Sequence, residues 1–483
     1  MGLFGILLAL VLLIWLAYRG WSILLLAPAA AMVTAAASGE PLLAHWTQTF
    51  MGGAAGFVAQ FFPLFLLGAL FGKLMDDSGS VTAIANFMTR KLGAKRAILA
   101  VVLAGAIVTY GGVSLFVAFF VLAPMAHALF KAAGIPVRLM PAAILLGTST
   151  FTMSALPGTP AVQNAIPMPF FSTTPFAAPG LGIIASAIML SFGLWWLTRA
   201  EASARRAGEG YVAPSGMEVD VSEDVMVRER ATVAREFDPA EIHHGQRSHD
   251  APSALVAAIP LVVVILVNLL MTLVVLPRMD TGWLAEARWG GTSLAAVGGV
   301  WSVITALLAA IAVLVALNYR RLPSLRDTMD AGVNACALPL LSVASLVGFG
   351  AVVASLPSFA LVRDWVLSIE GGPLVSLAVA TNVLAALTGS ASGGLTIALQ
   401  SLASTYMELA HTLGIDPALM HRVSVIGAGT LDSLPHNGAV VTLLAVCGST
   451  HREGYMNIVV VGIIGPIIGL AAVIALGGAL GSF

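Results

Sequence analysis

Long runs of apolar residues constrain the fold of this chain more than any other feature. Most runs are about 16 to 25 residues long and rich in Leu, Ala, Val and Ile, which suits helices that cross a bilayer. Unpaired backbone groups are costly in hydrocarbon, and a barrel would require strands of about ten residues with alternating polarity. The sequence therefore predicts an all-α polytopic membrane protein. The apolar runs lie at about 2–17, 21–38, 54–75, 97–130, 139–170, 178–198, 253–277, 293–317, 333–355, 372–407, 420–449 and 456–481.

The composition agrees with this fold class. Hydrophobic residues make up 58% of the chain and charged residues 10%, whereas a soluble domain contains about 25% charged residues. Too few charges remain to cover a water-exposed surface, so most of the outer surface must contact a lipid bilayer. The net charge of −1 gives no reason to expect a nucleic-acid partner. Because Cys336 and Cys447 lie in separate apolar runs without metal-type spacing, we expect no metal and no cofactor.

A polar segment divides the apolar runs into two groups. Residues 199–250 contain seven arginines and eleven acidic residues, too polar a composition to form a core of their own. We therefore expect a solvated linker at 199–252, between a first transmembrane part at 1–198 and a second at 253–483. The segment also contains His243, His244 and His249, which a flexible polar loop explains better than a metal site.

The two transmembrane parts share a weak sequence repeat. Residues 154–162 (SALPGTPAV) resemble residues 432–440 (DSLPHNGAV) at an offset of 278. The same offset aligns residues 111–114 with residues 389–392. Several matches in order at one offset indicate an internal duplication.

Two apolar runs are too long for a single spanning helix. Runs 97–130 and 372–407 are each interrupted near the middle by small residues, and we interpret each as a re-entrant helical hairpin. Each half then has five crossings and one hairpin. An odd number of crossings inverts the second half, so the predicted fold is two inverted repeats.

The distribution of basic residues tests this topology. With both hairpins re-entrant, 19 of the 23 lysines and arginines fall on one side of the membrane and 4 on the other. The asymmetry is lost if the hairpins are crossings. The positive-inside rule places the basic side in the cytoplasm. We therefore expect a cytoplasmic linker and both termini outside, in a bacterial-type inner membrane.

The tips of the two hairpins are candidate binding elements. Glycines let the backbone approach a ligand closely, and a break exposes amide groups at the start of the next helix. Together with a serine hydroxyl, these amides suit a carboxylate. Tight packing of small residues is the alternative explanation. The candidates are Gly111, Gly112 and Ser114 in the first tip, and Gly389, Ser390, Ser392 and Gly393 in the second.

Proline and glycine also interrupt one later helix in each half. Unwound backbone at membrane depth persists only where it contacts protein or lines a wet cavity, so the polar side chains beside it are candidates for substrate binding. A simple proline kink with satisfied polar groups is the alternative. The candidates are Ser154, Thr159 and Asn164 in the first break, and Asp432, His436 and Asn437 in the second.

Asp432 is the acidic residue that we place nearest the middle of the membrane. An acid at this depth is costly and is a functional candidate by default. Together with His436, it is our candidate for binding and releasing a coupling proton; a static hydrogen bond that fixes the break is the alternative. The aligned residue in the first half is Ser154, so the two halves differ chemically here. Arg422, near the outer side, is expected either to attract anions or to anchor its helix at the interface.

At these residues the chain resembles the gluconate permease family (GntP), within a wider superfamily of ion transporters. The resemblance is carried by residues 67–79 with 91–95, by the break at 156–160 and by the approach to the second break at 427–430. It implies proton symport of sugar acids or other small hydroxy-monocarboxylates. The superfamily implies a homodimer and an elevator mechanism. The scaffold helices would be those in 1–96 and 253–371, and the hairpins and transport helices those in 97–198 and 372–483.

The two breaks depart from the pattern of gluconate-type members. Residues 155–160 read ALPGTP and residues 432–438 read DSLPHNG, which is more similar to a branch associated with short hydroxy acids such as 3-hydroxybutyrate. The leading hypothesis is a proton-coupled symporter of a small hydroxycarboxylate. The alternatives are a sodium-coupled symporter of the same fold, a passive channel, and an intramembrane serine hydrolase using Ser392 and His436. The hydrolase is disfavoured because no Gly-x-Ser-x-Gly elbow is present, and we expect a transporter rather than an enzyme.

Overall fold

The computed structural model describes residues 2–19, 21–213, 248, 250–435 and 437–483. Every regular element in these ranges is a helix, as the apolar runs predict. Among the described residues, seven helices are long and apolar enough to cross a membrane. The pair Ser80–Leu92 and Ala94–Tyr110, which is bent by 100°, would make an eighth if it formed one span. The described helices long and apolar enough to cross a membrane are Leu42–Asp77, Leu115–Ala133, Pro179–Arg206, Ala254–Arg278, Leu294–Asn318, Leu325–Ser355 and His451–Leu480.

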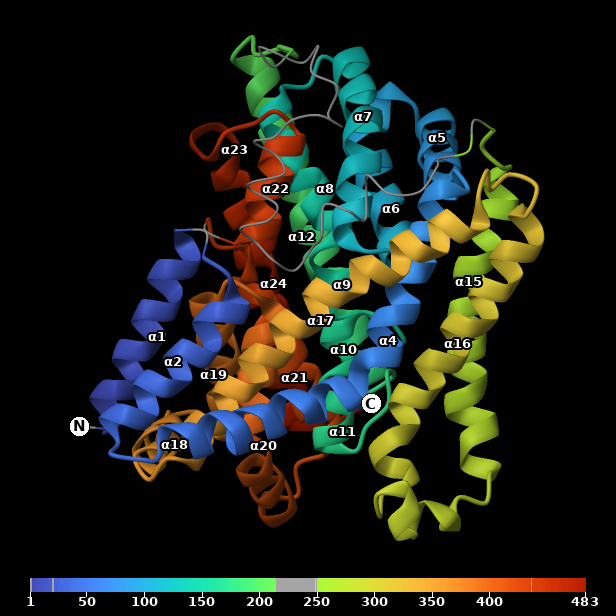
Figure 1. Cartoon of the computed structure of the whole chain (residues 1–483). Helices are drawn as coiled ribbons and strands as arrows, with labels where there is room; N and C mark the ends of the chain where they lie inside the picture. The colour runs from blue at the N-terminus through green and yellow to red at the C-terminus, as the bar shows by residue number, and fades with distance from the viewer. Residues whose placement is uncertain (1, 20, 214–247, 249, 436) are drawn as a thin grey trace.

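Both halves are built from long and short helices (Figure 1). The main helices of the first half are α1 (Gly2–Tyr18), α2 (Ile23–Ala37), α3 (Leu42–Ala44), η1 (His45–Phe50), α4 (Met51–Asp77), α5 (Ser80–Leu92), α6 (Ala97–Tyr110), α7 (Leu115–Ala133), α8 (Met140–Thr148), α9 (Phe151–Ser154), α10 (Val162–Ala165), α11 (Pro167–Phe171) and α12 (Pro179–Arg206). Those of the second half are α15 (Ala254–Leu270), α16 (Leu294–Asn318), α17 (Leu325–Ser355), α18 (Phe359–Leu367), α19 (Pro373–Thr388), α20 (Ala391–Leu413), α21 (Pro417–Thr430), η8 (Leu431–Ser433), α22 (Gly438–Val446), α23 (His451–Ile458), η9 (Val459–Ile464) and α24 (Gly465–Leu480).

The helices follow in the same order in the two halves. A helix pair (α1–α2 or α15–α16) and a long helix (α4 or α17) come first. A short helix (α5 or α18), a hairpin (α6–α7 or α19–α20), a broken helix (α8–α11 or α21–α22) and a final helix (α12 or α23–α24) follow. The second helix of each hairpin ends at a glycine in the left-handed conformation, Gly134 (φ 66°) or Gly414 (φ 68°), which terminates a helix at little steric cost.

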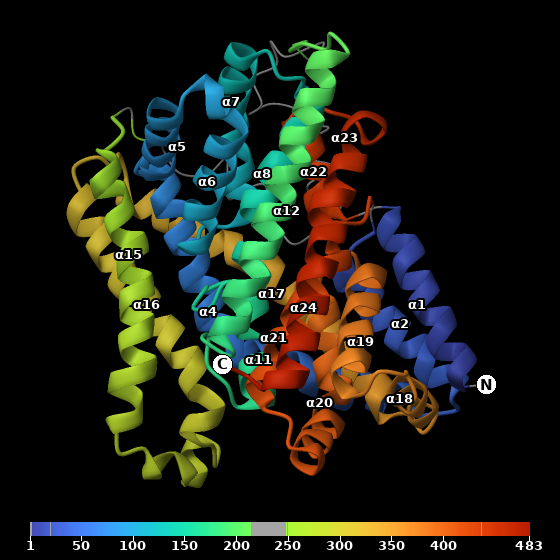
Figure 2. The ribbon, with the colours of Figure 1, turned by 180° about the vertical axis from the view of Figure 1, so that it is seen from behind.

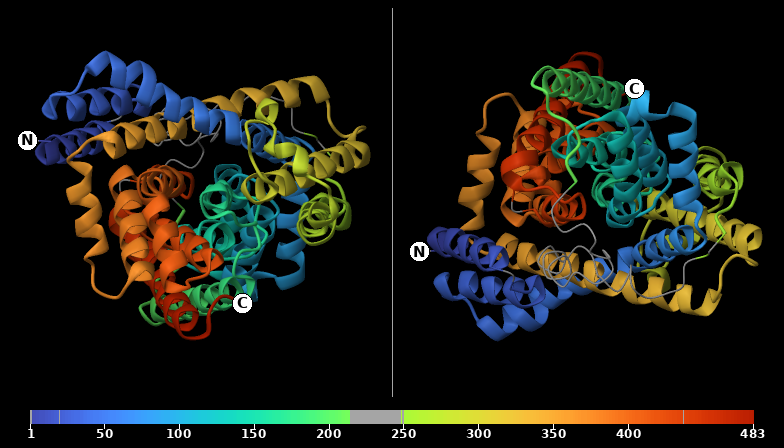
Figure 3. Two further views of the ribbon diagram at one scale, coloured as in Figure 1. Left: turned by 90° about the horizontal axis from the view of Figure 1, so that it is seen from below. Right: turned by 90° about the horizontal axis from the view of Figure 1, so that it is seen from above.

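The helices form two layers, which are seen end-on in Figure 3. We call α1–α4 and α15–α17 the scaffold layer, and the hairpins, broken helices and final helices the core layer. Within the scaffold layer α4 packs along α17, and α2 and α16 pack beside them. The short helices α5 and α18 connect the two layers at opposite ends of the molecule.

The two hairpins enter the core layer from opposite ends. In Figure 1 the open end of α6–α7 lies at the top and the open end of α19–α20 lies at the bottom, and Figure 2 shows the same arrangement from behind. Their tips, residues 111–114 and 389–390, both lie toward the middle of the molecule. Elements that are far apart in sequence are thereby brought to one place.

A buried ion pair within α4 is linked to α17 by a hydroxyl group. Lys73 Nζ of α4 lies 2.9 Å from Asp77 Oδ1, and Thr328 Oγ1 of α17 donates to Asp77 Oδ2 over 2.7 Å. The two charged side chains are only 1% and 0% exposed. Burial of charges at this depth requires a partner for each, and the ion pair and the hydroxyl supply them.

The structure shifts one predicted boundary. Helix α12 continues to Arg206, eight residues into the predicted linker, because Glu201 and Arg205 pair at i,i+4 over 2.7 Å and extend the helix with water-soluble residues. Tyr211 then follows and its hydroxyl lies 3.0 Å from His127 Nδ1 of α7. The histidines at 243, 244 and 249 lie outside the described residues.

Candidate functional site

A cavity of about 190 Å³ lies between the two layers. The scaffold layer forms one side of the cavity, through α4 and α17, while the core layer contributes both hairpin tips and the first break. The residues that line the cavity are Leu64, Phe65, Gly68, Ala69, Thr109, Gly112, Val113, Ser114, Leu115, Phe116, Thr148, Met153, Pro160, Ala161, Val162, Gln163, Ala335, Cys336, Pro339, Val343 and Ser392.

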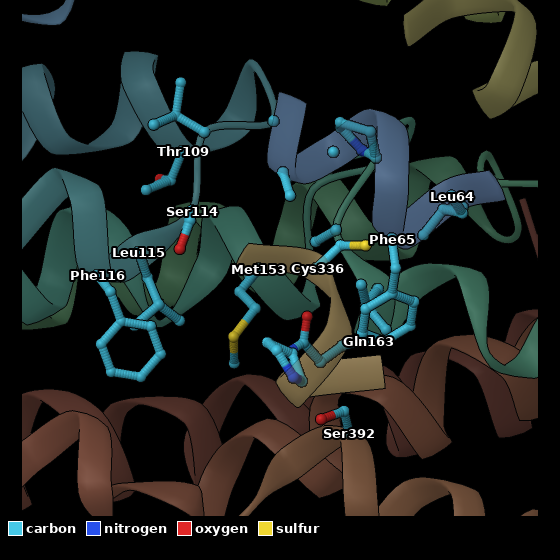
Figure 4. Close-up of a pocket in the computed structure, with 18 of the residues that line it drawn as sticks. Leu64, Phe65, Thr109, Ser114, Leu115, Phe116, Met153, Gln163, Cys336 and Ser392 are labelled. Carbon is cyan, nitrogen blue, oxygen red and sulfur yellow. The ribbon is translucent and has the colours of Figure 1, made fainter. Parts of the chain in front are cut away.

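The two sides of the cavity differ in chemistry (Figure 4). The scaffold side is apolar and includes Leu64, Phe65 and Val343. The core side carries hydroxyl and amide groups, and Figure 4 shows the Ser114 hydroxyl on the left, with Gln163 and Ser392 below it and to the right. A ligand with one polar end and one apolar face would match both sides.

Ser114 stands at the start of a helix that opens on the cavity. It is the N-cap of α7, yet its side chain makes no capping bond, and the first i→i−4 bond of the helix is Ala118 N to Ser114 O at 3.0 Å. The positive end of the helix dipole therefore faces the cavity. Neither the Ser114 hydroxyl nor the Gln163 amide hydrogen-bonds to another described residue, so both are available to a ligand.

The first tip is held against the first break. Tyr110 donates its hydroxyl hydrogen to Pro157 O over 2.8 Å. Gly112 has φ 102°, and a Cβ at this position would lie 2.9 Å from Pro160 Cγ. The position therefore requires glycine for its backbone conformation and for the close approach of Pro160. The first tip and the first break thus form one wall of the cavity.

The second tip is held against the second break by different residues. Asn437 Nδ2 donates to Gly389 O over 2.7 Å and to Asp432 Oδ1 over 2.6 Å. Asn437 Oδ1 accepts from Ala439 N and so caps α22. In the tip, Ser390 Oγ accepts from Gly393 N over 3.1 Å and lies 3.2 Å from Ser392 Oγ.

The predicted site residues take two positions. Gly112, Ser114 and Ser392 line the cavity. The others are not among the lining residues: Gly111 packs on Leu261 of α15, and Gly393 packs on Leu346 of α17. The predicted residues outside the lining are Gly111, Ser154, Thr159, Asn164, Gly389, Ser390, Gly393, Asp432 and Asn437. His436 lies outside the described residues.

The cavity also contains residues that sequence reasoning did not select as site residues. Cys336 and Pro339 of α17 and Phe65 of α4 belong to apolar helices, and nothing in a run of apolar residues marks which of them faces a cavity. Gln163 gave a usable signal, because it is a polar residue beside the unwound segment at 155–161. Within the described residues no three His, Cys, Asp or Glu side chains converge where they could hold a metal ion.

Arg422 does not lie at a lipid interface, as its place in the sequence suggested. Its side chain is fully buried behind the first break. Nε and Nη2 donate to Ala177 O over 3.1 and 2.7 Å, and Nη1 donates to Asn164 Oδ1 over 3.3 Å. Neighbouring His421 bonds Asn164 Oδ1 over 3.2 Å. The guanidinium lies inside the protein because the carbonyl of Ala177, just before α12, and the Asn164 side chain are buried acceptors that need donors.

Sequence comparisons place the chain among known permeases. A sequence model described as GntP family permease matches residues 1–168. Over 465 residues the chain is 39% identical to the "Uncharacterized transporter YxjC" of Bacillus subtilis (strain 168), and the match covers 95% of each protein. The chain belongs to the GntP permease family. A shorter match, 38% identical over 87 residues and 18% of each protein, relates this GntP permease to the "Inner membrane permease YgbN" of Escherichia coli (strain K12).

The fold of this GntP permease is similar to that of a solved transporter. The crystal structure of the YdaH transporter of Alcanivorax borkumensis matches it with a TM-score of 0.55, over 90% of this chain and 88% of that chain. The two sequences are 17% identical, so the likeness concerns the fold alone. With the apolar helices, these relationships identify a multi-pass membrane transporter rather than an enzyme.

Proposed function

We propose that this permease is a secondary active transporter that carries a small hydroxy-monocarboxylate together with a proton. The observation that carries the proposal is the cavity in which the uncapped start of α7, with the Ser114 hydroxyl, faces the Gln163 amide, and neither group hydrogen-bonds to another described residue. Backbone amides at a helix start and a hydroxyl donor are the groups that bind a carboxylate. The Ser392 hydroxyl, from the opposite hairpin, is placed to bind the substrate hydroxyl.

The size and the apolar side of the cavity favour a short carbon skeleton. At about 190 Å³ the cavity is smaller than the ~300 to 1,000 Å³ of drug-sized sites. A polyhydroxylated sugar acid would leave hydroxyls unpaired against Leu64, Phe65 and Val343, and an unpaired buried polar group is costly. A short acid of the 3-hydroxybutyrate type would place its methyl end there instead. We therefore favour that class over gluconate.

Asp432 is our proposed proton carrier. It lies behind the second tip, and Asn437 joins its carboxylate to Gly389 O. Protonation of Asp432 weakens its hydrogen bond from Asn437 and so changes how the tip is held. Proton binding can thus be transmitted to the hairpin that carries Ser392, with Asp432 and the neighbouring His436 as the coupling pair.

We propose two inverted repeats with an elevator movement. The opposite entry of the two hairpins and the equal order of helices support the repeats, and the distribution of basic residues supports a cytoplasmic linker, outer termini and an inner-membrane location. The apolar scaffold side of the cavity makes few directional bonds, which suits a surface along which the core layer slides. By family resemblance we also propose a homodimer.

Counterflow in proteoliposomes with a panel of labelled carboxylates tests the substrate class. We expect exchange with short hydroxy-monocarboxylates and accumulation driven by an imposed pH gradient. Accumulation that depends on a sodium gradient and not on pH would show that the coupling ion is sodium and not the proton. Flux without accumulation above equilibrium would indicate a channel and contradict the symport proposal.

A further inference from the structure

Arg422 carries a charge that no acidic side chain balances in the described part of the chain. Of the lysines and arginines described, only Lys73 and Arg422 are buried, and Lys73 is paired with Asp77. The four hydrogen bonds of Arg422 go to uncharged acceptors: Ala177 O twice, Ser154 O and Asn164 Oδ1. A buried charge without an opposite partner is costly, so its retention requires an explanation.

Ionisable groups around Arg422 do not supply the missing negative charge. Tyr110 donates to Pro157 O, and Tyr406 of the packed helix α20 is bonded to Ser376. His421 uses both ring nitrogens, toward Thr173 Oγ1 over 2.6 Å and Asn164 Oδ1 over 3.2 Å. We count His421 as neutral, because a second positive charge beside Arg422 would be repelled by it.

Asp432, the proposed proton carrier, is the second ionisable residue on which the charge balance of the core layer depends. Its carboxylate accepts from neutral donors, Asn437 Nδ2 over 2.6 Å and the Ala391 amide. Of the elements packed against η8, α19 and η9 carry no ionisable residue, and α21 carries His421 and Arg422. The two nearby ionisable groups on α23 contact backbone instead: the hydroxyl of Tyr455 donates to Ser433 O, and His451 bonds Pro435 O. His436 lies outside the described residues.

We infer that Arg422 is a fixed counter-charge that couples the substrate anion to the proton, an inference that rests on the proposed function. With substrate bound and Asp432 protonated, the core carries +1 from Arg422 and −1 from the substrate, and is neutral. Empty and with Asp432 ionised, it is again neutral. Substrate alone leaves a net −1, and a proton alone leaves a net +1. Because a net charge is costly to move through hydrocarbon, the core crosses with both or with neither.

This charge count gives each variant a distinct behaviour. In Asp432→Asn the loaded core is neutral and the empty core carries +1, so exchange persists, pH-driven accumulation fails, and downhill net uptake is slowed by the charged return step. In Arg422→Gln the empty, protonated core is neutral and returns with its proton, so the pH gradient no longer drives uptake. Arg422→Lys keeps the charge and the coupling, at a reduced rate because lysine lacks the guanidinium fork. Adding Arg422→Gln to Asp432→Asn leaves the loaded core at −1 and abolishes exchange.

The experiment measures uptake and exchange of labelled 3-hydroxybutyrate in proteoliposomes, with pH gradient and membrane potential imposed separately. We expect pH-driven accumulation to fall at least about tenfold in Arg422→Gln and to persist in Arg422→Lys and in the exposed control Arg363→Gln. If Arg422→Gln accumulates substrate at the wild-type level in response to a pH gradient, the inference is overturned while the proposed function stays intact. Absence of pH-driven accumulation in the wild type would overturn both.

A second measurement needs no change at Arg422 and applies if that variant does not fold. In Asp432→Asn the returning empty core carries +1, so an inside-positive potential should accelerate downhill uptake, whereas exchange by the same variant should not respond to potential. Net uptake by Asp432→Asn that is independent of potential would show that the empty core is uncharged and would overturn the inference.

Discussion

Asn437 donates to Asp432 over 2.6 Å, and the same amide nitrogen donates to Gly389 O over 2.7 Å. One side chain thus joins the acid of the second break to the second hairpin tip. Its Oδ1 separately caps α22 by accepting from Ala439 N over 2.7 Å. The residue therefore has a local role in helix stability and a long-range role in holding the tip.

Two substitutions of Asn437 separate these roles. Asn437→Ala removes the cap and the link to Asp432, and should lower the free energy of unfolding by about 1 kcal/mol and slow pH-driven uptake. Asn437→Ser retains a capping hydroxyl but is too short to reach Asp432. It should slow uptake with little loss of stability, measured by thermal unfolding in detergent. Equal uptake by Asn437→Ser and the wild type would contradict the linking role.

Ser114→Ala tests the proposed carboxylate site. Loss of a hydrogen bond to a charged ligand should raise KM for uptake by about tenfold or more, with little change in stability because the hydroxyl has no hydrogen-bond partner among the described residues. The control is Ser355→Ala, because Ser355 donates its hydroxyl to Val352 O and is not among the residues that line the cavity. An unchanged KM in Ser114→Ala would remove Ser114 from the site.

Gly112→Ala tests the contact between the first tip and the first break. The added Cβ would meet Pro160 Cγ at 2.9 Å, and φ 102° is unfavourable for alanine. We expect loss of transport and a destabilisation of more than about 2 kcal/mol. Gly134→Ala is the control, because Gly134 has φ 66° but open space around it, and only strain of about 1 kcal/mol applies. Similar behaviour of the two variants would show that the close contact is unimportant.

Cys336 offers a direct probe of cavity occupancy. It lines the cavity, whereas Cys447 is fully buried elsewhere. A small methanethiosulfonate reagent should inhibit the wild type and the Cys447→Ala variant, but not Cys336→Ala. Substrate at ten times its Kd should slow the modification about tenfold by occupying the cavity. Modification at an unchanged rate in saturating substrate would place the binding site elsewhere.

Lys73→Met tests the ion pair of the scaffold layer. The change leaves Asp77 buried without its cation and should lower the free energy of unfolding by about 3 kcal/mol. Arg326→Gln is the comparison, because the Arg326–Asp330 pair is 88% and 66% exposed and should contribute nothing measurable. Thermal unfolding of both variants in one detergent measures the difference. An unchanged stability of Lys73→Met would contradict a stabilising role for this ion pair.

The sequence by itself determined the helices and the places where they break. Run length, glycine and proline act locally, so the hairpin tips at 111–114 and 389–390 and the breaks beside Pro157 and Pro435 could be located without a structure.

Only the tertiary structure decided which side chains face the cavity. Ser114 and Gln163 line the cavity, whereas Asn164, one residue after Gln163, bonds to Arg422 and His421. Arg422 looked like an interfacial residue, and its burial depends on carbonyls more than 240 residues away in the chain. The depth and partners of a side chain are set by packing between distant helices, and this information is absent from any local pattern.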